Sequence, residues 1–456
     1  MSDLMLSYYG DDFTGSTDVM ESLSFSGLKT VLFLGPPTSE QMAHFTDLRA
    51  VGVAGRTRSM APGDMDRELV PVCEAFKALN TPIVHYKTCS TFDSSPDIGS
   101  IGHAIDLGRD VFGSEFVPLV VGAPALNRYC VFGNLFARSG LDSELFRLDR
   151  HPTMKRHPIT PMDEADIRVH LSRQTRRSIG LVDVLDLALA GRALDAAFDR
   201  VMSAKPEVVL FDTLNEAHLP SIGRLICERA PIQPQFVAGS SGVEYALVAY
   251  WKEAGLLPEA VIPPALEAAG PIVVVSGSCS PVTAGQIDFA VQNGFGEVAL
   301  DPVALVNSAT ADQAVETGIA DGLRVLQQGR SVILHTGRGP DDPRIGKTMT
   351  YFQATGYTDL EIRLRSGAIL GRALGRILKG ILAGSDVRRA ATAGGDTSFY
   401  IARALGVWAL EAVAPTAPGS PMCRVYGQGL EDVQMTFKGG QVGKVDFFVN
   451  VRTGRF

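Results

Sequence analysis

Two adjacent aspartates form the first group of residues that could do chemistry. Asp11 and Asp12 directly follow an apolar segment, residues 4–9, and Thr14 comes two residues later in the sequence GDDFTGSTD. Neighbouring carboxylates can hold sugar hydroxyls, accept a proton or bind Mg²⁺ through water. Alternatively, Thr14 or Ser16 could cap the helix that follows while an aspartate favours its dipole, so both interpretations stay open for this pair.

Cations and hydroxyls follow two further apolar segments. Residues 50–54 lead into GRTRS, and residues 83–86 lead into KTCSTFD. The candidates are Arg56, Arg58, Lys87, Ser90, Thr91 and Asp93. Taken singly, such cations are usually solvated surface charges. Guanidinium groups, however, match carboxylates through two parallel hydrogen bonds, so this cluster and the aspartate pair together predict a pocket for a small anion.

A proline-rich loop lies between these clusters and the second half of the chain. Residues 147–162 read RLDRHPTMKRHPITPM and show no apolar period, which is typical of a functional loop. His157, just before a proline, could contact a substrate or donate to a carboxylate. Simple exposure to solvent is the alternative.

Glycine-rich turns follow apolar segments in the second half. Residues 272–276 open into GSCSPVT, which contains Ser276 and Ser278, and residues 389–393 open into the sequence AGGDTS. The second turn contains Gly394, Gly395, Asp396 and Thr397. Free amide groups at a helix start attract phosphate, so these turns predict a phosphate-binding site. Asp396 could bind Mg²⁺ or accept a proton from a hydroxyl.

Other signals are weaker or absent. Gly440, in KGGQVGK, could close over a nucleotide or form a hairpin turn. The sequence GPDDPRIGKT has Asp341 where a P-loop needs glycine, and neither GxGxxG with its following acid nor GxSxG occurs. Cys279 could act as the nucleophile of a thiol hydrolase, but no histidine accompanies it in a motif.

The elements that must position these residues alternate between short β-branched runs and segments of helical period. This pattern predicts α/β domains built on largely parallel sheets, with short strands from residue 407 onward, including 445–449, as a mixed or antiparallel edge. A helix is expected over 163–174, with Thr160 as its N-cap. The four prolines of 255–271 predict a linker between a domain of residues 1–254 and one of residues 272–456.

Composition excludes several classes of protein. The 456 residues carry 50 acidic and 42 basic side chains, a net charge of -8 that disfavours nucleic acid as a partner. The longest apolar stretch, residues 116–126, is interrupted by prolines and is far shorter than the ~20 residues of a membrane helix. The first residues lack a basic region, so a cytoplasmic protein without membrane partners is expected, and a homo-oligomer stays open.

These motifs in order resemble the four-carbon acid sugar kinase family: DDFTGSTD, YKTCSTFDSSP, RHPITPM, SGSCSPVT, AGGDTS and KGGQVGKVDFF. The resemblance implies an acid-sugar-binding domain, a nucleotide-binding domain, and transfer of phosphate from ATP, with Mg²⁺, to the terminal hydroxyl of a tetronate or 3-oxo-tetronate. By motif position, the residues facing the sugar would be Asp11, Asp12, Arg56, Lys87 and Ser90, and those facing ATP would be Ser276, Ser278, Gly394 to Thr397 and Gly440.

The segments differ in which branch of the family they resemble. YKTCSTFDSSP is similar to the 3-oxo-tetronate kinases, whereas YYGDDFTGSTDVMESL and VFGNLFAR are similar to the 3-oxo-isoapionate kinases. The motifs therefore indicate the type of reaction more clearly than they indicate which acid sugar is the substrate. The proton of the attacking hydroxyl could be accepted by Asp12, Asp93 or Asp396. A non-catalytic protein that binds a sugar acid is the alternative from another functional class.

Overall fold

The structure, a computed structural model, describes residues 4–138, 144–229, 234–257, 263 and 265–456, except for the side chain of Asp396. The chain forms two compact units, one of residues 1–30 and 35–261 and the other of residues 31–34 and 262–456. Each unit contains a mostly parallel sheet with helices packed on it, which confirms the predicted α/β class.

The main sheet of the first unit is parallel, with its strands in the order β3-β1-β4-β11-β5-β10-β9. Most of these strands are buried along their whole length, as expected when helices cover both faces. Beside it lies a small antiparallel sheet, β6-β7-β8. The strands are β1 (Leu6–Gly10), β3 (Ala50–Ala54), β4 (Ile83–Lys87), β5 (Val117–Val120), β6 (Arg128–Val131), β7 (Asn134–Arg138), β8 (Leu145–Arg147), β9 (Ile179–Val182), β10 (Val208–Phe211) and β11 (Gln235–Gly239).

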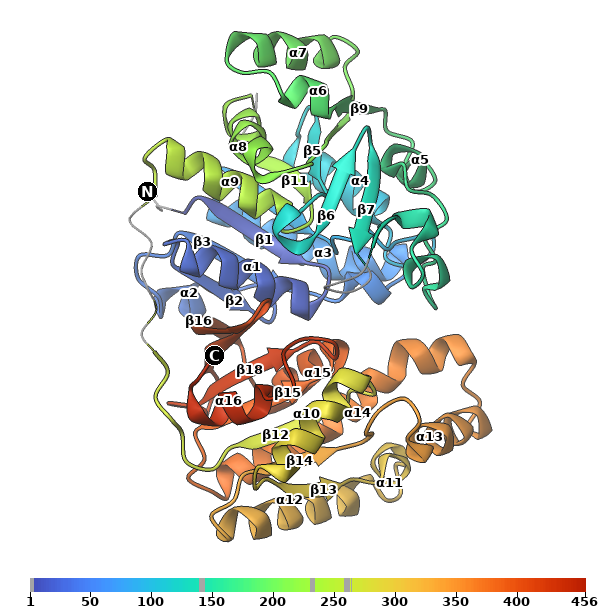
Figure 1. The fold of residues 1–456 in the computed structure, drawn as a ribbon, viewed down its shortest axis with the longest axis vertical. Coiled ribbons are helices and arrows are strands. Elements are labelled where there is room, and N and C mark those ends of the chain that lie inside the picture. The colour runs from blue at the N-terminus through green and yellow to red at the C-terminus, as the bar shows by residue number, and fades with distance from the viewer. Residues whose placement is uncertain (1–3, 139–143, 230–233, 258–262, 264) are drawn as a thin grey trace. The chain divides into compact units, whose positions relative to one another are not determined.

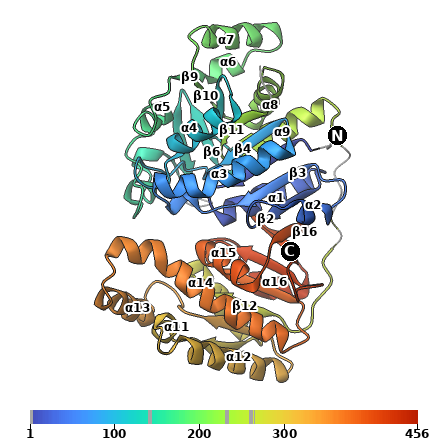
Figure 2. The ribbon, with the colours of Figure 1, turned by 180° about the vertical axis from the view of Figure 1, so that it is seen from behind.

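Helices of the first unit pack on both faces of its main sheet. Figures 1 and 2 show α1 and α9 on one face and α3 and α4 on the other, in agreement with the contacts between α1 and α9 and between α3 and α4. The helices are α1 (Phe13–Phe25), α2 (Ser39–Ala43), α3 (Pro62–Leu79), α4 (Ile101–Phe112), α5 (Ile167–Leu171), α6 (Val184–Leu187), α7 (Arg192–Met202), α8 (Leu219–Glu228) and α9 (Gly242–Glu253).

The sheet of the second unit has the order β13-β14-β12-β15-β18-β17-β16-β2. It is parallel from β13 to β18 and antiparallel from β18 to β2, as the predicted mixed edge requires. Strand β2 comes from the N-terminal part of the chain. The strands are β2 (Thr30–Phe33), β12 (Val273–Ser276), β13 (Gly296–Ala299), β14 (Val332–His335), β15 (Arg389–Ala393), β16 (Ala409–Ala417), β17 (Ser420–Tyr426) and β18 (Gln434–Lys438).

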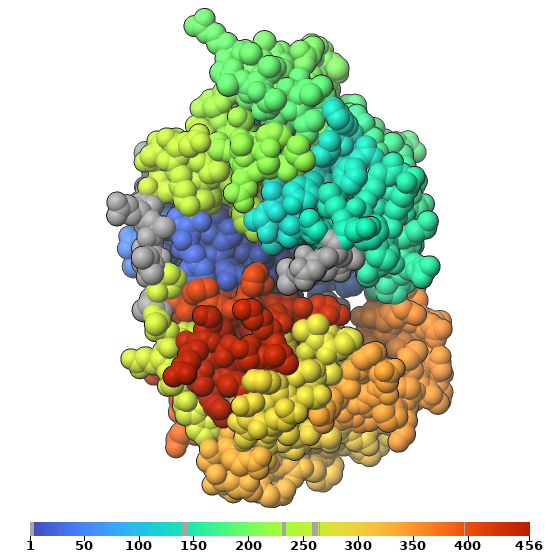
Figure 3. All heavy atoms as spheres, viewed as in Figure 1, coloured from blue at the N-terminus to red at the C-terminus, as the bar shows by residue number. Residues whose placement is uncertain are grey.

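Helices α10 and α16 pack together in the second unit and are seen side by side, in yellow and red, on the surface in Figure 3. Helices α12, α14 and α15 form another packed layer. The helices are α10 (Pro281–Gln292), α11 (Pro302–Val306), α12 (Ala311–Gln327), α13 (Pro343–Ala354), α14 (Asp359–Ala383), α15 (Gly395–Leu405) and α16 (Phe447–Thr453).

Two predicted elements were wrong. The helix expected over 163–174 is the short α5, and its N-cap is Asp166, whose carboxylate accepts from Arg168 N, whereas Thr160 bonds to a histidine instead. Residues 445–449 do not form a strand but lead into helix α16. Phe447, Phe448 and Val451 form its buried side, and this spacing fits one face of a helix.

Each parallel region has a point where successive connections run in opposite directions. In the first unit the chain passes from β1 through β2 to β3 on one side of β1, and β3 connects back to β4 on the other side. In the second unit β12 has β14 and β15 as its two neighbours in the same way. Ligands of open α/β sheets bind outside the carboxyl ends of strands at such points.

Candidate functional site

The aspartate pair lies at the carboxyl end of β1, beside the end of β4. Asp11 N donates to Lys87 O at 2.9 Å, which continues the pairing of the two strands. Asp12 has extended backbone and is the N-cap of α1, with its Oδ1 accepting from Gly15 N at 2.8 Å. The cap expected from Thr14 or Ser16 is thus supplied by Asp12, whose other carboxylate oxygen faces Arg58.

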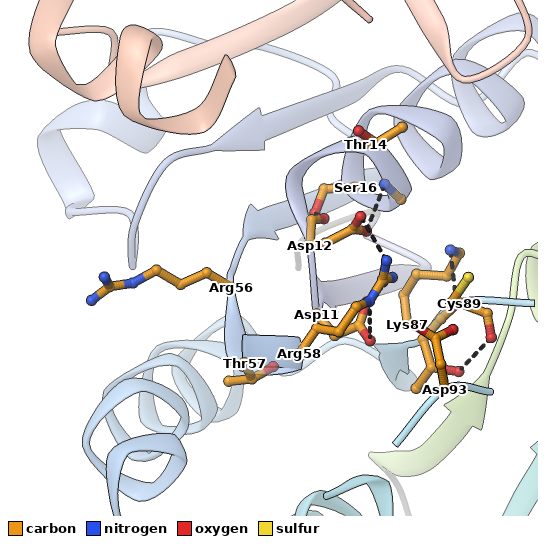
Figure 4. A network of polar contacts seen from close by, with 12 residues as sticks. Asp11, Asp12, Thr14, Ser16, Arg56, Thr57, Arg58, Lys87, Cys89 and Asp93 are labelled. Atoms are coloured by element: carbon orange, nitrogen blue, oxygen red, sulfur yellow. Dashed lines mark hydrogen bonds and ion pairs between the residues drawn. The ribbon is translucent and has the colours of Figure 1, made fainter. Parts of the chain in front are cut away.

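Arg58 joins both carboxylates (Figure 4). Its Nε and Nη2 donate to Asp11 at 3.2 and 2.7 Å, and its Nη1 donates to Asp12 Oδ2 at 2.9 Å. A short 3₁₀ turn, Thr57–Ser59, holds the arginine in place, and Arg58 N itself donates to Asp11 O at 3.1 Å. The guanidinium thus uses most of its donors within the protein.

Burial sets the protonation of this cluster. The Asp11 side chain is 3% exposed and that of Asp12 is 20% exposed. Burial raises the pKa of Asp11 to about 6, even though Arg58 opposes the shift. Asp12 is therefore the carboxylate of this pair that a bound hydroxyl can reach.

Lys87 ends β4 beside the start of α1. It is buried, and its Nζ donates to Thr88 O at 3.0 Å. A Cβ placed on Gly15 would lie 3.0 Å from Nζ and 2.5 Å from Asp12 Oδ1, so only glycine leaves this space open between the cation and the carboxylate. The ammonium group also interacts electrostatically with Asp18, which accepts a hydrogen bond from Ser241.

A tight turn follows β4. Phe92 N donates to Cys89 O, and Phe92 has φ of 55°, an unusual value for a bulky residue, while its ring is fully buried. Ser90 lies in this turn, and Thr91 Oγ1 donates to Asp93 Oδ1 at 2.6 Å. Burial would raise the pKa of Asp93, but Arg58, Thr91 and His157 together lower it. The structure therefore brings Asp93 and His157 to the aspartate pair and Arg58.

His157 is held by the loop that contains it. Its Nδ1 accepts from Thr160 N at 3.0 Å and contacts the Thr160 hydroxyl at 2.9 Å. Two other predicted residues lie apart from the cluster. Figure 4 shows the side chains of Arg56 and Thr14 directed away from Arg58, and Arg56 reaches Glu68 at 3.7 Å with 43% of its side chain exposed.

The glycine turns of the second unit meet at the carboxyl ends of β12, β15 and β18. Gly277 N donates to Ala393 O at 3.0 Å, and Gly394 N donates to Lys438 O at 2.9 Å. Gly394 has φ of 117°, which L side chains rarely adopt, and precedes the first turn of α15. A Cβ on Gly440 would lie 2.7 Å from Ser278 Oγ. The predicted ATP-facing residues thus come together around the starts of α10 and α15.

Serine side chains shape the turn after β12. Ser276 Oγ accepts from Ser278 N at 3.3 Å, Ser278 Oγ accepts from Ser280 N at 3.2 Å, and Ser280 caps α10 by accepting from Val282 N. Thr397, in the first turn of α15, is buried with its side chain next to Gly277. The side chain of Asp396 lies outside the described residues.

The loop after β18 is anchored on α10. Thr283 Oγ1 donates to Gly440 O at 2.8 Å, and Gln286 Nε2 donates to the carbonyls of Val442, Gly443 and Lys444. Lys438 is completely buried and donates from Nζ to Thr283 Oγ1 at 3.0 Å. Burial lowers the pKa of this lysine to about 7.

A thiol nucleophile finds little support. The Cys279 thiol has its pKa raised by burial and by Asp342, the opposite of what a nucleophile needs. Within the part of the chain that the structure describes, no group of three or more His, Cys, Asp or Glu side chains is placed to hold a metal ion. No helix among the described residues is long and apolar enough to cross a membrane.

Comparison with known proteins assigns a domain type to each half of the chain. Residues 6–247 match a sugar-binding N-terminal domain, and residues 273–448 match a nucleotide-binding C-terminal domain. The chain belongs to the four-carbon acid sugar kinase family. The 3-oxo-isoapionate kinase of Paraburkholderia graminis is 44% identical, over 99% of this chain and 95% of its own length. A 3-oxo-tetronate kinase of Pseudomonas savastanoi pv. phaseolicola is 29% identical, over 97% and 96% of the two chains.

Two solved structures share the fold. A Haemophilus influenzae protein of the DUF1537 family has a TM-score of 0.72 at 23% identity, covering 99% of this chain and all of its own, 100%. A Salmonella typhimurium LT2 protein described as a candidate tRNA synthase has a TM-score of 0.77 at 24% identity and covers 98% of both chains. At these identities the likeness concerns the fold.

Three functional candidates were not foreseen from the sequence. Arg58 was noted beside Arg56 but not chosen, although it is the arginine that contacts the aspartates. In the sequence, Lys438 stood out only as part of a glycine-rich turn, whereas the structure buries it. Arg128, at the start of β6, gave no signal at all, because its neighbours in the site come from distant parts of the chain.

Proposed function

We propose that this protein is an ATP-dependent kinase that phosphorylates the terminal hydroxyl of a small acid sugar. Residues 1–254 bind the acid sugar, residues 255–271 link the domains, and residues 272–456 bind the nucleotide. The observation that carries the proposal is the pair of strand-end sites with complementary chemistry. One offers carboxylates and cations to a hydroxylated anion, and the other offers backbone amides at two helix starts to phosphates.

In the nucleotide domain, the phosphates lie against the turns that contain Gly394 and Gly440, where the absence of side chains lets the backbone approach closely. Ser276, Ser278, Gly395 and Thr397 complete this site. Asp396 would be the protein ligand of Mg²⁺, a cation that prefers phosphate, water and one or two carboxylates. Such an ion would supply positive charge to offset the charge on the transferred phosphoryl group.

In the sugar domain, Asp12 accepts the proton of the attacking hydroxyl. Its carboxylate is the more exposed of the pair, and each oxygen has a lone pair beyond those used by Gly15 N and Arg58. Lys87, Ser90 and Asp93 line the same strand ends and orient the sugar. Phosphoryl transfer demands little base strength, so the position of Asp12 matters more than its basicity.

The preferred acid is 3-oxo-isoapionate, with 3-oxo-tetronate as the second choice. A kinase named for the first compound is 44% identical to this chain, whereas kinases named for the second are 26% to 30% identical. The opening segment and the segment around residues 131–138 resemble the same branch. Both acids combine a carboxylate, a ketone and a free hydroxymethyl group, so one site chemistry serves either.

The direct test is a coupled ADP-release assay with Mg·ATP and a panel of 3-oxo-isoapionate, 3-oxo-tetronate, threonate and erythronate. We expect ADP only when an acid is present, a highest kcat/KM with 3-oxo-isoapionate, and a phosphate monoester by ³¹P NMR. A protein that binds these acids saturably but releases no ADP would be a non-catalytic binding protein, and the kinase proposal would be wrong.

A further inference from the structure

Arg128 has an unusual set of contacts for a partly buried arginine. Its Nη1 donates to the carbonyls of Leu126 and Asn127 at 3.1 and 3.2 Å, which fixes the side chain against its own loop. Its Nε is buried without a hydrogen-bond partner. Among the described residues it forms no ion pair, and burial lowers its pKa because no carboxylate compensates the charge.

The unused donors of Arg128 lie on one edge of the guanidinium. Nε carries one hydrogen and Nη2 carries two, and no hydrogen bond occupies either atom in the described structure. This edge presents two parallel N–H groups, which is the geometry that binds a carboxylate with two hydrogen bonds. Arg58 uses the same edge for Asp11, which shows how such a pair forms in this fold.

The position of Arg128 places it at the proposed sugar site. It forms a bridge with Ala123, just past the carboxyl end of β5, on the same sheet edge as the ends of β1 and β4. It interacts electrostatically with Cys89, in the turn that also carries Ser90 and Asp93. Cys89 in turn interacts electrostatically with Asp93 and Arg58, so Arg128 and the aspartate cluster have this turn as a common neighbour.

The other cations of this region are already engaged. Arg58 is held by two carboxylates, Lys87 is buried next to Asp18, and Arg56 reaches Glu68 and points away in Figure 4. We infer that Arg128 binds the carboxylate of the acid sugar through its Nε and Nη2 edge and so selects acids over neutral sugars. This inference rests on the proposed kinase function and adds the residue that sets its substrate class.

The test removes the negative charge from the substrate and, separately, the positive charge from residue 128, and compares the effects on turnover. Wild type, Arg128→Ala and Arg128→Lys are assayed for ADP release with the best acid of the panel and with its primary amide, which lacks the negative charge. We expect Arg128→Ala to lower kcat/KM for the acid about 100-fold, the effect of two charge-assisted hydrogen bonds, and to change kcat/KM for the amide less than threefold. The lysine variant should recover part of the loss, since it restores charge without the fork.

Arg147→Ala is the matched control. Arg147 lies on β8 of the same small sheet, but it already forms two hydrogen bonds with Asp149, at 2.7 and 2.6 Å. We expect this variant to keep the acid preference of the wild type. Thermal melting of each variant separates loss of folding from loss of recognition.

Two outcomes would overturn the inference. One is an Arg128→Ala variant with wild-type KM for the acid, and the other is an equal loss for acid and amide, which would indicate a general structural role. If the wild type turns over no acid at all, the kinase proposal fails by itself. Calorimetric titration of the same acids into wild type and Arg128→Ala then still decides whether Arg128 binds the carboxylate.

Discussion

Replacing Lys438 with Met should stabilise the second unit at neutral pH and lose this advantage as the pH rises. The ammonium group is fully buried at the end of β18, with one hydrogen bond to Thr283 and the rings of Phe447 and Phe448 within 6.0 Å. No ion pair with Lys438 is seen among the described residues. Its pKa is lowered to about 7 by burial alone.

The magnitude follows from proton linkage. An unfolded lysine has a pKa of about 10.4, so unfolding takes up a proton between pH 7 and this value, and wild-type stability rises with pH across that window. At about 1.36 kcal/mol per pKa unit, the buried amine lowers the free energy of unfolding by about 4 kcal/mol at pH 7 and by about 1.4 kcal/mol at pH 9.5. The Lys438→Met variant does not titrate, so its advantage should shrink by about 3 kcal/mol between these pH values.

Tryptophan fluorescence can follow each unit separately. The protein has 2 tryptophans, Trp251 in α9 of the first unit and Trp408 just before β16 of the second. Urea unfolding is therefore measured through Trp408 in a Trp251→Phe background, at pH 7, 8 and 9.5, without nucleotide. Lys444→Met, an exposed lysine of the same loop, is the control and should show no such pH dependence.

The reasoning is refuted by a stability difference between Lys438→Met and wild type that stays constant with pH. A difference that grows with pH would be equally contradictory, since it would mean that the folded protein holds the lysine charged. Either result would show that the amine has a partner that compensates its charge.

Four other substitutions test the two sites. Arg58→Ala should cost about 3 kcal/mol at pH 7 in urea unfolding, because it leaves buried carboxylates unpaired, and less at pH 5, where Asp11 with its raised pKa of about 6 takes up a proton. Arg56→Ala should change KM for the acid less than threefold, since this side chain is 43% exposed and pairs with Glu68; a tenfold rise would contradict the geometry. Gly394→Ala should raise KM for ATP at least tenfold at unchanged KM for the acid, because its φ of 117° excludes a Cβ at low energy. Cys279→Ser should keep most of the activity in the ADP-release assay, and complete loss would favour thiol chemistry.

The elements around both sites could be predicted because their signals are local. A buried parallel strand is a short apolar run, and the turn and helix start that follow it show glycine and serine in the same stretch of sequence. Strand β15 and the turn at Gly394 are of this kind, and so are β1 and the start of α1, although the cap of that helix is Asp12 and not Thr14 or Ser16. A phosphate-binding turn between a strand and a helix can therefore be predicted from one short stretch of sequence, without knowledge of tertiary contacts.

What could not be predicted depends on neighbours that are distant in sequence. Arg56 and Arg58 are equivalent in the sequence GRTRS, and only the 3₁₀ turn after β3 decides which one reaches the aspartates. The start of helix α16 resembles a short strand in sequence, because residues 445–449 read VDFFV, and its helical packing on α10 depends on residues distant in the chain. Lys438 is covered by the rings of Phe447 and Phe448, which reach it only because the chain after β18 folds back toward the end of that strand.

The formal charges of the sugar site bear on the class of substrate that it binds. Without Arg128, the formal charges of the site are three carboxylates against two cations. These residues are Asp11, Asp12, Asp93, Arg58 and Lys87. An acid sugar would bring a further negative charge into a partly buried region, where repulsion is strong. Arg128 is a cation of this region that forms no ion pair among the described residues, so acid binding would supply the carboxylate that its guanidinium lacks.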